Sequence, residues 1–280
     1  MHEPSILNVV IEIVGGGLIG LSCGWELQQR GYDVVVYEMD LSRIKSSSWA
    51  GAGMLGAHAE SFPDEAWRQR AFESAAMYGA WVERLGGTID YHAGREGEDG
   101  HVDPRDLLRE LTKRVAIVDR RVDSLGTLLG EQVVVCAGAW AGTLGGLPLV
   151  EPVKGYLLAW DGIAPGTLAG ILRDGHTYIL QRKNGRVIAG STEQRIGFDR
   201  SMDQNWISEL QSRAQSLWPL LKGREVAEVW FGFRPGSEIP VVRRINERVV
   251  AAYGHYRNGI LLAPWTARWV ADEIQRQLGK

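Results

Sequence analysis

A glycine-rich turn near the N-terminus restricts the fold of this chain more than any other feature. Its glycines have the spacing Gly-x-Gly-x-x-Gly, and they stand between an apolar run and a segment of helical periodicity. A second β-rich run follows and ends at an acidic residue, so the segment predicts a β-α-β unit. Its parts in order are residues 9–14, Gly15, Gly17, Gly20, a helix over residues 18–30, residues 33–37 and Glu38.

Such a unit can bind a dinucleotide. Gly15 permits a tight turn, Gly17 lets the backbone approach a pyrophosphate, and Gly20 lets the helix pack on the strand. The first helical N–H groups, at Leu18 and Ile19, would face the phosphates, and the acidic residue after the second strand would accept hydrogen bonds from ribose. The alternative is a tight turn that binds no ligand.

The next segment, residues 43–61, favours FAD over NAD as the dinucleotide. It is small and polar, and its periodicity predicts neither helix nor strand. Small residues allow a backbone to lie against a large planar ligand, and serine hydroxyls can bind a second phosphate. The residues that we expect to contact the cofactor here are Ser47, Ser48, Ala52, Gly53 and Met54. A flexible Gly/Ser loop is the alternative interpretation.

The rest of the chain predicts an α/β fold: a Rossmann-like FAD-binding domain with a discontinuous, inserted α+β substrate domain that combines an antiparallel sheet with helices. Residues 1–85, 101–150 and 228–280 would form the FAD-binding domain, and residues 86–100 and 151–227 the substrate domain. We expect a loop over residues 86–100, and a strand over residues 228–233 that Arg234-Pro235-Gly236 breaks. Glu12 does not fit a strand buried on both faces; it would lie near the strand edge or pair with a buried group.

Composition excludes several classes of protein. The net charge is −3, so no electrostatic field favours nucleic acid or an anionic membrane, and no run of about 18 apolar residues could span a bilayer. Cys23 and Cys136 lack metal-ligand spacing, so we expect no metal and two reduced thiols in a cytoplasmic protein. The N-terminal residues show no secretory signal pattern.

Four motifs resemble the D-amino acid oxidase superfamily, and specifically the bacterial glycine oxidases of thiamine biosynthesis. The motifs occur in family order from Ile11 to the C-terminus, with gaps. They are residues 48–58 (SWAGAGMLGAH), residues 101–105 (HVDPR), residues 178–182 with 185–193 (YILQR and GRVIAGSTE), and residues 230–236 followed by 254–264 (WFGFRPG and GHYRNGILLAP).

The resemblance implies non-covalently held FAD and a substrate pocket over one face of the flavin. Arg257 would bind the substrate carboxylate, Tyr178 would add a hydroxyl to it, and Arg234 would raise the positive potential of the same site. The helix beginning near Pro264 would direct its N-terminus at the flavin. Further cofactor contacts would come from Gly138, Trp140, Arg234, Tyr256, Arg257, Asn258, Gly259, Ile260 and Leu261.

The implied reaction is oxidative deamination of glycine or another small amine or D-amino acid by O₂, giving the imine, then the 2-oxo acid and ammonia, with H₂O₂. The alternatives are a D-amino acid dehydrogenase that uses another electron acceptor, a flavin-binding protein with weak or no turnover, and an NAD-dependent dehydrogenase. We also expect a homo-oligomer and transfer of the imine to a thiazole-forming enzyme. The chain is short for this family, chiefly between Leu85 and His101.

Overall fold

The computed structural model describes residues 9–42 and 46–279, and in this part of the chain the strands form three sheets. The first sheet has the order β13-β14-β7-β1-β2-β6, and its strands are parallel except for β13. The strands are β1 (Val10–Val14), β2 (Asp33–Glu38), β6 (Ile117–Asp119), β7 (Gln132–Val135), β13 (Val241–Arg244) and β14 (Val249–Tyr253). The segments that supply them lie far apart in sequence, as expected for a discontinuous domain.

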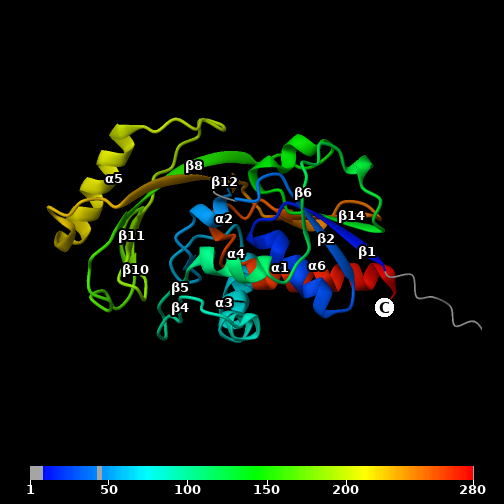
Figure 1. The fold of residues 1–280 in the computed structure, drawn as a ribbon, viewed down its shortest axis with the longest axis horizontal. Coiled ribbons are helices and arrows are strands. Elements are labelled where there is room, and N and C mark those ends of the chain that lie inside the picture. The colour runs from blue at the N-terminus through cyan, green and yellow to red at the C-terminus, as the bar shows by residue number, and fades with distance from the viewer. Residues whose placement is uncertain (1–8, 43–45, 280) are drawn as a thin grey trace, which may run out of the picture.

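Four helices pack together on one face of this parallel sheet (Figure 1). Buried residues of α1, α3, α4 and α6 share one hydrophobic core with β1 and β2. The helices are α1 (Leu18–Gln29), α3 (Glu65–Leu85), α4 (Pro104–Thr112) and α6 (Ala263–Leu278), and short 3-10 helices occur at η1 (Leu125–Thr127), η2 (Gly138–Leu144) and η4 (Tyr256–Asn258). Asp64 and Asp103 cap α3 and α4 by accepting hydrogen bonds from Trp67 N and Arg105 N.

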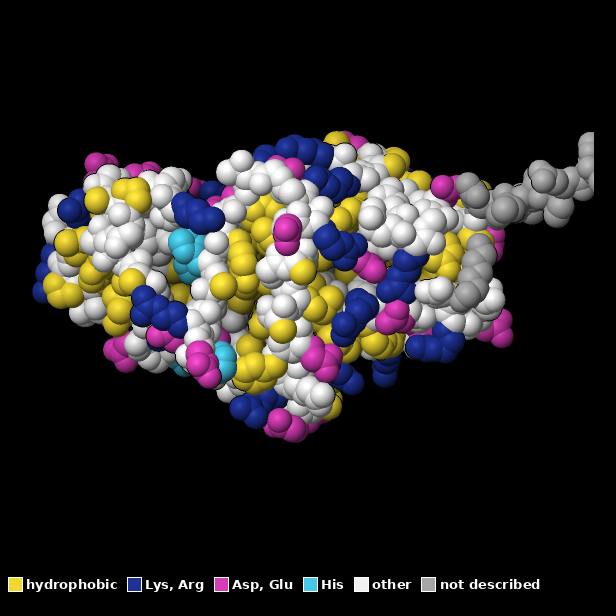
Figure 2. Space-filling model, turned by 90° about the horizontal axis from the view of Figure 1, so that it is seen from below, with side chains coloured by type: hydrophobic (Ala, Val, Ile, Leu, Met, Phe, Trp, Pro, Cys, Tyr) yellow, Lys and Arg dark blue, Asp and Glu magenta, His cyan; other side chains and the backbone are white. Residues whose placement is uncertain are grey.

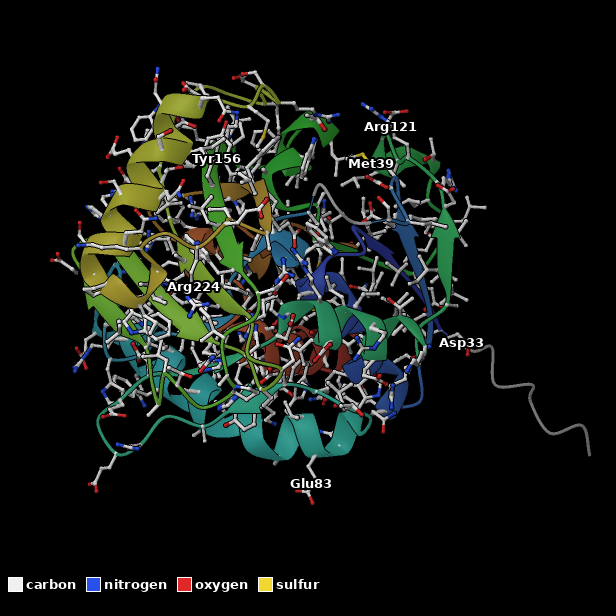
Figure 3. All side chains as sticks on the ribbon, turned by 60° about the vertical axis from the view of Figure 1, so that its left-hand side comes forward. Asp33, Met39, Glu83, Arg121, Tyr156 and Arg224 are labelled. Atoms are coloured by element: carbon white, nitrogen blue, oxygen red, sulfur yellow. The ribbon has the colours of Figure 1, made fainter. Side chains whose placement is uncertain are left out.

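The second sheet is antiparallel and has the order β12-β8-β11-β10-β9. Its strands are β8 (Glu151–Trp160), β9 (Leu172–Asp174), β10 (Thr177–Gln181), β11 (Val187–Gly190) and β12 (Glu228–Gly236). Helix α5 (Gln204–Leu217), followed by η3 (Pro219–Leu221), covers one face, where Tyr156 lies under the helix (Figure 3). The other face packs on α2 (Ser47–Ala50) and the residues that follow it. The predicted α/β fold with an antiparallel substrate sheet is confirmed.

Strand β12 corrects one expectation. The predicted break at Arg234-Pro235-Gly236 is wrong, because these residues continue the strand and pair with residues 151–153 of β8. β12 is the edge strand of its sheet, and Pro235 lies opposite Pro152, so neither missing N–H interrupts a ladder in the sheet interior. The proposed domain boundary at residue 228 therefore separates two strands that are hydrogen-bonded to each other.

The segment expected to be a loop, residues 86–100, contributes to a small third sheet. This sheet has the order β3-β5-β4, with β3 (Met54–Leu55), β4 (Tyr91–His92) and β5 (Gly100–Val102). Strands of two or three residues carry too little periodicity to be found from sequence. The small, polar segment of residues 43–61, in which neither helix nor strand was expected, contains α2 (Ser47–Ala50) and β3, and its residues 43–45 lie outside the described residues.

Glu12, which did not fit a buried strand, is a buried residue with two hydrogen-bond partners. Its side chain is 6% exposed, accepting hydrogen bonds from Tyr37 Oη at 2.8 Å and Gly130 N at 2.5 Å. The carboxylate thus joins β1 to the neighbouring strand β2 and to the loop before β7. Within the described residues, no helix is long and apolar enough to cross a membrane, and Figure 2 shows charges of both signs interspersed over one face.

Candidate active site

One cavity runs from the glycine-rich turn to the antiparallel sheet. It begins beside Gly15 and Glu38, passes the segment after α2, and ends at Tyr178 and Arg234 on the second sheet. Met39 and Arg121, labelled in Figure 3, line the end of the cavity nearest Glu38, after β2 and β6. The cavity thus connects the dinucleotide motif to the residues that sequence analysis assigned to substrate.

The glycine-rich turn has the geometry that its spacing predicts. Gly15 has φ 107°, and a Cβ there would lie 2.5 Å from the Cys136 carbonyl oxygen. A Cβ at Gly20 would lie 1.9 Å from the Gly15 oxygen, so Gly20 permits contact between helix and turn and does not line the cavity. A Cβ at Gly17 would meet only Ser48 Oγ, at 3.4 Å, which leaves this position open to a ligand.

The polar partners of the turn come from β2 and α2. Glu38 accepts hydrogen bonds from Gly16 N at 2.7 Å and Asp40 N at 2.9 Å. Ser48 Oγ accepts a bond from Leu18 N, at the start of α1, at 3.0 Å. Both side chains line the cavity, where the Glu38 carboxylate could accept a hydrogen bond from a ribose hydroxyl and the Ser48 hydroxyl could donate one to a phosphate oxygen.

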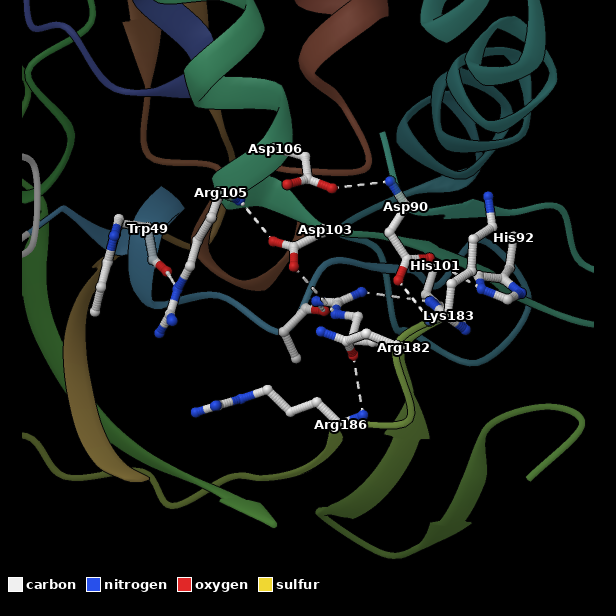
Figure 4. Close-up of polar contacts among 12 residues, drawn as sticks. Trp49, Asp90, His92, His101, Asp103, Arg105, Asp106, Arg182, Lys183 and Arg186 are labelled. Carbon is white, nitrogen blue, oxygen red and sulfur yellow. Dashed lines mark hydrogen bonds and ion pairs between the residues drawn. The ribbon is translucent and has the colours of Figure 1, made fainter. Parts of the chain in front are cut away.

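A buried arginine holds the segment after α2 in place. Arg182 is 3% exposed, and its Nη2 donates to the Ala52 carbonyl oxygen at 2.6 Å. Its Nε lies 3.5 Å from Asp103 Oδ2, and its Nη1 lies 3.4 Å from His101 Nδ1 (Figure 4). Burial and the charge of Arg182 lower the pKa of His101 to about 3, so the imidazole stays neutral beside the guanidinium. Arg182 thereby ties the end of β10 to residues that line the cavity.

Arg234 and Tyr178 form the end of the cavity at the antiparallel sheet, where sequence analysis expected the substrate. Arg234 Nη2 donates to Ser191 Oγ at 2.8 Å, and its Nη1 donates to the Thr192 carbonyl oxygen at 3.2 Å. Two glycines make room: a Cβ at Gly155 would lie 2.2 Å from Arg234 Nη1, and one at Gly190 would lie 2.4 Å from Tyr178 Oη. Burial raises the pKa of Tyr178, although both cavity arginines act against this, so the phenol remains a hydrogen-bond donor.

Arg257 is already paired with a carboxylate of this chain. Its Nε donates to Glu60 Oε2 at 2.8 Å, and its Nη2 donates to Glu60 Oε1 at 3.1 Å. Burial lowers the pKa of Arg257, but the hydrogen bonds and charge of Glu60 outweigh this and leave it raised. Sequence analysis missed Glu60, which lies just beyond the first family motif and 197 positions from its partner.

Helix α3 supports the segment that follows β14. Ser74 Oγ donates to the Leu261 carbonyl oxygen at 2.7 Å, and Tyr78 Oη donates to the Ile260 carbonyl oxygen. Both side chains are fully buried. They hold residues 260 and 261 from the side of α3, while Ile260 also faces the cavity and Leu261 does not line it.

The cavity brings together most of the predicted site residues. The exceptions are Gly20 and Leu261. Those on its lining are Gly15, Gly17, Leu18, Ile19, Glu38, Ser47, Ser48, Ala52, Gly53, Met54, Gly138, Trp140, Tyr178, Arg234, Tyr256, Arg257, Asn258, Gly259 and Ile260. In the described part of the chain, no group of three or more His, Cys, Asp or Glu residues could hold a metal.

The parallel sheet, the glycine turn and the elongated cavity define a dinucleotide-binding protein in which an antiparallel sheet covers the cofactor site. More particularly, the chain belongs to the FAD dependent oxidoreductase family (DAO), whose model matches residues 11–95 and 91–273. FAD is thus the cofactor, and the open position at Gly17 and the length of the cavity fit it.

Several glycine oxidases are similar to this chain. The glycine oxidase of Geobacillus kaustophilus is 29% identical over 95% of this chain and 93% of its own length. The crystal structure of glycine oxidase from the same species has a TM-score of 0.87 and 27% identity, covering 96% of this chain and 95% of that chain. The bifunctional protein ThiO/ThiG of Synechocystis sp. is 30% identical, covering 95% of this chain and 51% of its own length.

The chain therefore spans about half the length of the bifunctional relatives and most of the length of the glycine oxidases. The predicted resemblance to glycine oxidases is confirmed. The alignment with the Geobacillus protein extends over 351 positions, against 280 residues in this chain, so that relative carries residues between the matched segments that this chain lacks.

Proposed function

We propose that this chain oxidises glycine or another small amine or D-amino acid, as an FAD-dependent amine oxidase of the glycine oxidase type. The observation that carries the proposal is a partly buried guanidinium, Arg234, beside the Tyr178 side chain in the cavity that begins at the dinucleotide turn. A substrate carboxylate is the ligand that such a pair binds most strongly, because a charge-assisted hydrogen bond in a dry site is strong.

We assign binding of the substrate carboxylate to Arg234 and Tyr178. The hydrogen bonds of Arg234 go to neutral acceptors, Ser191 and Thr192, so these bonds do not neutralise its charge. Both N–H groups on one side of the Arg257 guanidinium, which the resemblance assigned to the substrate carboxylate, already bind Glu60, so we do not assign the substrate to Arg257.

The protein's part in catalysis is orientation and electrostatics. FAD, held by the residues that line the cavity, would supply a two-electron acceptor for the hydride of the α-carbon and the reaction with O₂; the products would be the imine and H₂O₂, and hydrolysis of the imine would give the 2-oxo acid and ammonia. Arg234 and Tyr178 would fix the carboxylate and so orient the α-carbon. The N-terminus of α6 would stabilise negative charge on the reduced flavin. The ThiO/ThiG relatives support transfer of the imine to a thiazole-forming enzyme.

Anaerobic mixing of the yellow protein with glycine, sarcosine, D-alanine and D-proline in turn tests the proposal. We expect at least one amine to bleach the flavin, and the same amine to give peroxide in air. Bleaching without peroxide would indicate a dehydrogenase that uses another acceptor. No bleaching by any amine would indicate a flavin-binding protein without turnover.

The two arginines can be separated by substitution. Arg234→Met should raise KM steeply, by roughly 2 to 3 kcal/mol of lost substrate binding, because it removes the cation that contacts the carboxylate. Arg257→Met, made together with Glu60→Gln so that no unpaired carboxylate remains in the cavity, should have the smaller effect on KM. The reverse order would return the carboxylate to Arg257.

A further inference from the structure

The substrate end of the cavity contains two arginines, and one of them already binds a carboxylate. Glu60 offers both of its oxygens to Arg257, one to Nε and one to Nη2, at 2.8 and 3.1 Å. This is the bidentate arrangement that a free carboxylate ligand would adopt. Glu60 and Arg257 both line the cavity, so the pair forms part of its wall.

The Glu60 side chain is held in this position from its other side. A Cβ at Gly56 would lie 2.8 Å from Glu60 Cγ, so only glycine leaves room for this course of the side chain. Arg173 Nη1 lies 4.0 Å from Glu60 Oε1, while its Nη2 binds Asp99 Oδ2 at 2.8 Å. Glu60 is therefore fixed between two cations, and its side chain is only 12% exposed.

The two cavity arginines thus differ in whether they can still bind a carboxylate of the substrate. Arg234 donates to a hydroxyl and a backbone carbonyl, so a substrate carboxylate can still neutralise its charge. Arg257 is neutralised already. A second carboxylate on the substrate could not form this ion pair with Arg257, because Glu60 already occupies the guanidinium. Glu60 would also repel it, since like charges close to each other repel strongly where little water screens them.

We propose that Glu60 restricts the substrate to amines with a single carboxylate, by filling the fork of Arg257 that a second carboxylate would need. The inference rests on the proposed function for the assignment of the substrate carboxylate to Arg234. It makes Glu60 a specificity-determining residue. Glycine and its N-alkyl derivatives belong to the accepted class, whereas iminodiacetate and D-aspartate belong to the excluded class.

Equilibrium binding to the oxidised holoenzyme tests this without turnover. Acetate carries one carboxylate, and malonate, succinate and glutarate carry two at increasing separation; the visible absorbance of the flavin reports their binding. The natural protein should bind none of the diacids more tightly than acetate. In Glu60→Gln, which keeps the side-chain volume, at least one diacid should bind about tenfold more tightly, with acetate changing far less.

A matched control distinguishes occupation of the Arg257 guanidinium by Glu60 from the general electrostatic effect of a nearby carboxylate. Glu193 is a second carboxylate close to both arginines, but its partners are Tyr256 and Arg195 and not the fork of Arg257. Glu193→Gln should therefore give no selective gain for diacids. The double variant Glu60→Gln/Arg257→Met should lose the gain. An equal gain in Glu193→Gln, or a gain that survives in the double variant, would overturn the inference.

Other results are equally decisive. Tighter binding of a diacid than of acetate by the natural protein contradicts the inference, even if every Glu60 variant fails to fold. No gain for any diacid in Glu60→Gln or Glu60→Ala also contradicts it. If glycine bleaches the flavin while the diacid result fails, the proposed function stands and only the role of Glu60 falls. If no carboxylate perturbs the flavin in any variant, the carboxylate site fails, and both proposals fail with it.

Discussion

Several side chains in this protein are charged and buried, and each is matched by specific partners. Glu12 lies in the middle of a parallel sheet, where an unpaired carboxylate would be costly. It is stable there because each of its oxygens accepts one hydrogen bond, from Tyr37 and Gly130. Arg182 is matched in the same way by a carbonyl, a carboxylate and a neutral imidazole.

Replacing Glu12 by glutamine should destabilise the fold. The amide can accept only one of the two hydrogen bonds, so one buried donor loses its partner, which costs about 2 kcal/mol. Urea denaturation followed by circular dichroism would measure the change. Glu131→Gln, at an exposed position of the neighbouring loop, is the matched control and should change stability by less than about 0.5 kcal/mol. Equal stability of the two variants would contradict a structural role for the Glu12 carboxylate.

Replacing Arg182 by methionine should loosen the cofactor. The Ala52 carbonyl would lose its donor, and Asp103 would lose a cation, so the segment beside the cavity would no longer be fixed. We expect the dissociation constant for FAD to rise at least about tenfold, measured by the recovery of free-flavin fluorescence. Lys183→Met removes an exposed neighbouring cation as a control. Unchanged FAD affinity in Arg182→Met would show that the segment holds its position without this arginine.

At the scale of elements, the arrangement brings distant segments against one cavity. Helix α3 contacts the segment after β14, whose carbonyls at residues 260 and 261 accept bonds from Tyr78 and Ser74. The hydroxyls of α3 lie buried within the hydrophobic core, where they have no competing water. The helix therefore sets the position of the loop that leads into α6.

Tyr78→Phe tests this support. Loss of the hydroxyl leaves the Ile260 carbonyl without its donor, and the loop beside the cavity should shift. We expect weaker FAD binding and an altered flavin reduction potential, measured by equilibration with reference dyes. The control is Tyr156→Phe, in which a buried hydroxyl that also donates to a carbonyl is removed under α5. If both variants move the potential equally, the effect does not depend on the loop that α3 supports.

Sequence analysis found the elements with strong periodicity and missed those without it. The glycine turn, the helix that follows it and the second β-rich run have local signals, so their places were predicted from the sequence. β3, β4 and β5 are too short for any period, and the continuation of β12 through Pro235 depends on its being an edge strand. The pairs Arg182–Ala52 and Arg257–Glu60 are separated by 130 and 197 positions, and only the tertiary fold brings them together.

Across the whole molecule, the two larger sheets meet along the cavity, and two buried, neutral histidines lie in elements that support it. His101 lies in the small sheet against Arg182, facing also His92 and Lys183. His255 precedes η4, is 2% exposed, and its Nε2 lies 3.0 Å from Thr266 Oγ1 of α6. Burial lowers the pKa of His255 to about 4. Both groups are neutral in the folded protein at pH values where the unfolded chain is protonated.

Stability should therefore fall as the pH falls from 7.5 to 5. Below pH 6.5 the unfolded chain binds a proton at His255 that the folded protein does not bind until about pH 4, which favours unfolding. Between pH 7.5 and 5 this one group should cost roughly 2 kcal/mol. The unfolding free energy from urea titrations at several pH values measures the slope. In His255→Gln the loss of unfolding free energy between pH 7.5 and 5 should be smaller by that amount, whatever the change in absolute stability. His58→Gln, which removes an exposed histidine, is the control and should leave this loss nearly as it is in the natural protein. A slope that is the same in His255→Gln and in the natural protein would mean that His255 takes up its proton equally in the folded and unfolded states, against the burial that the structure assigns to it.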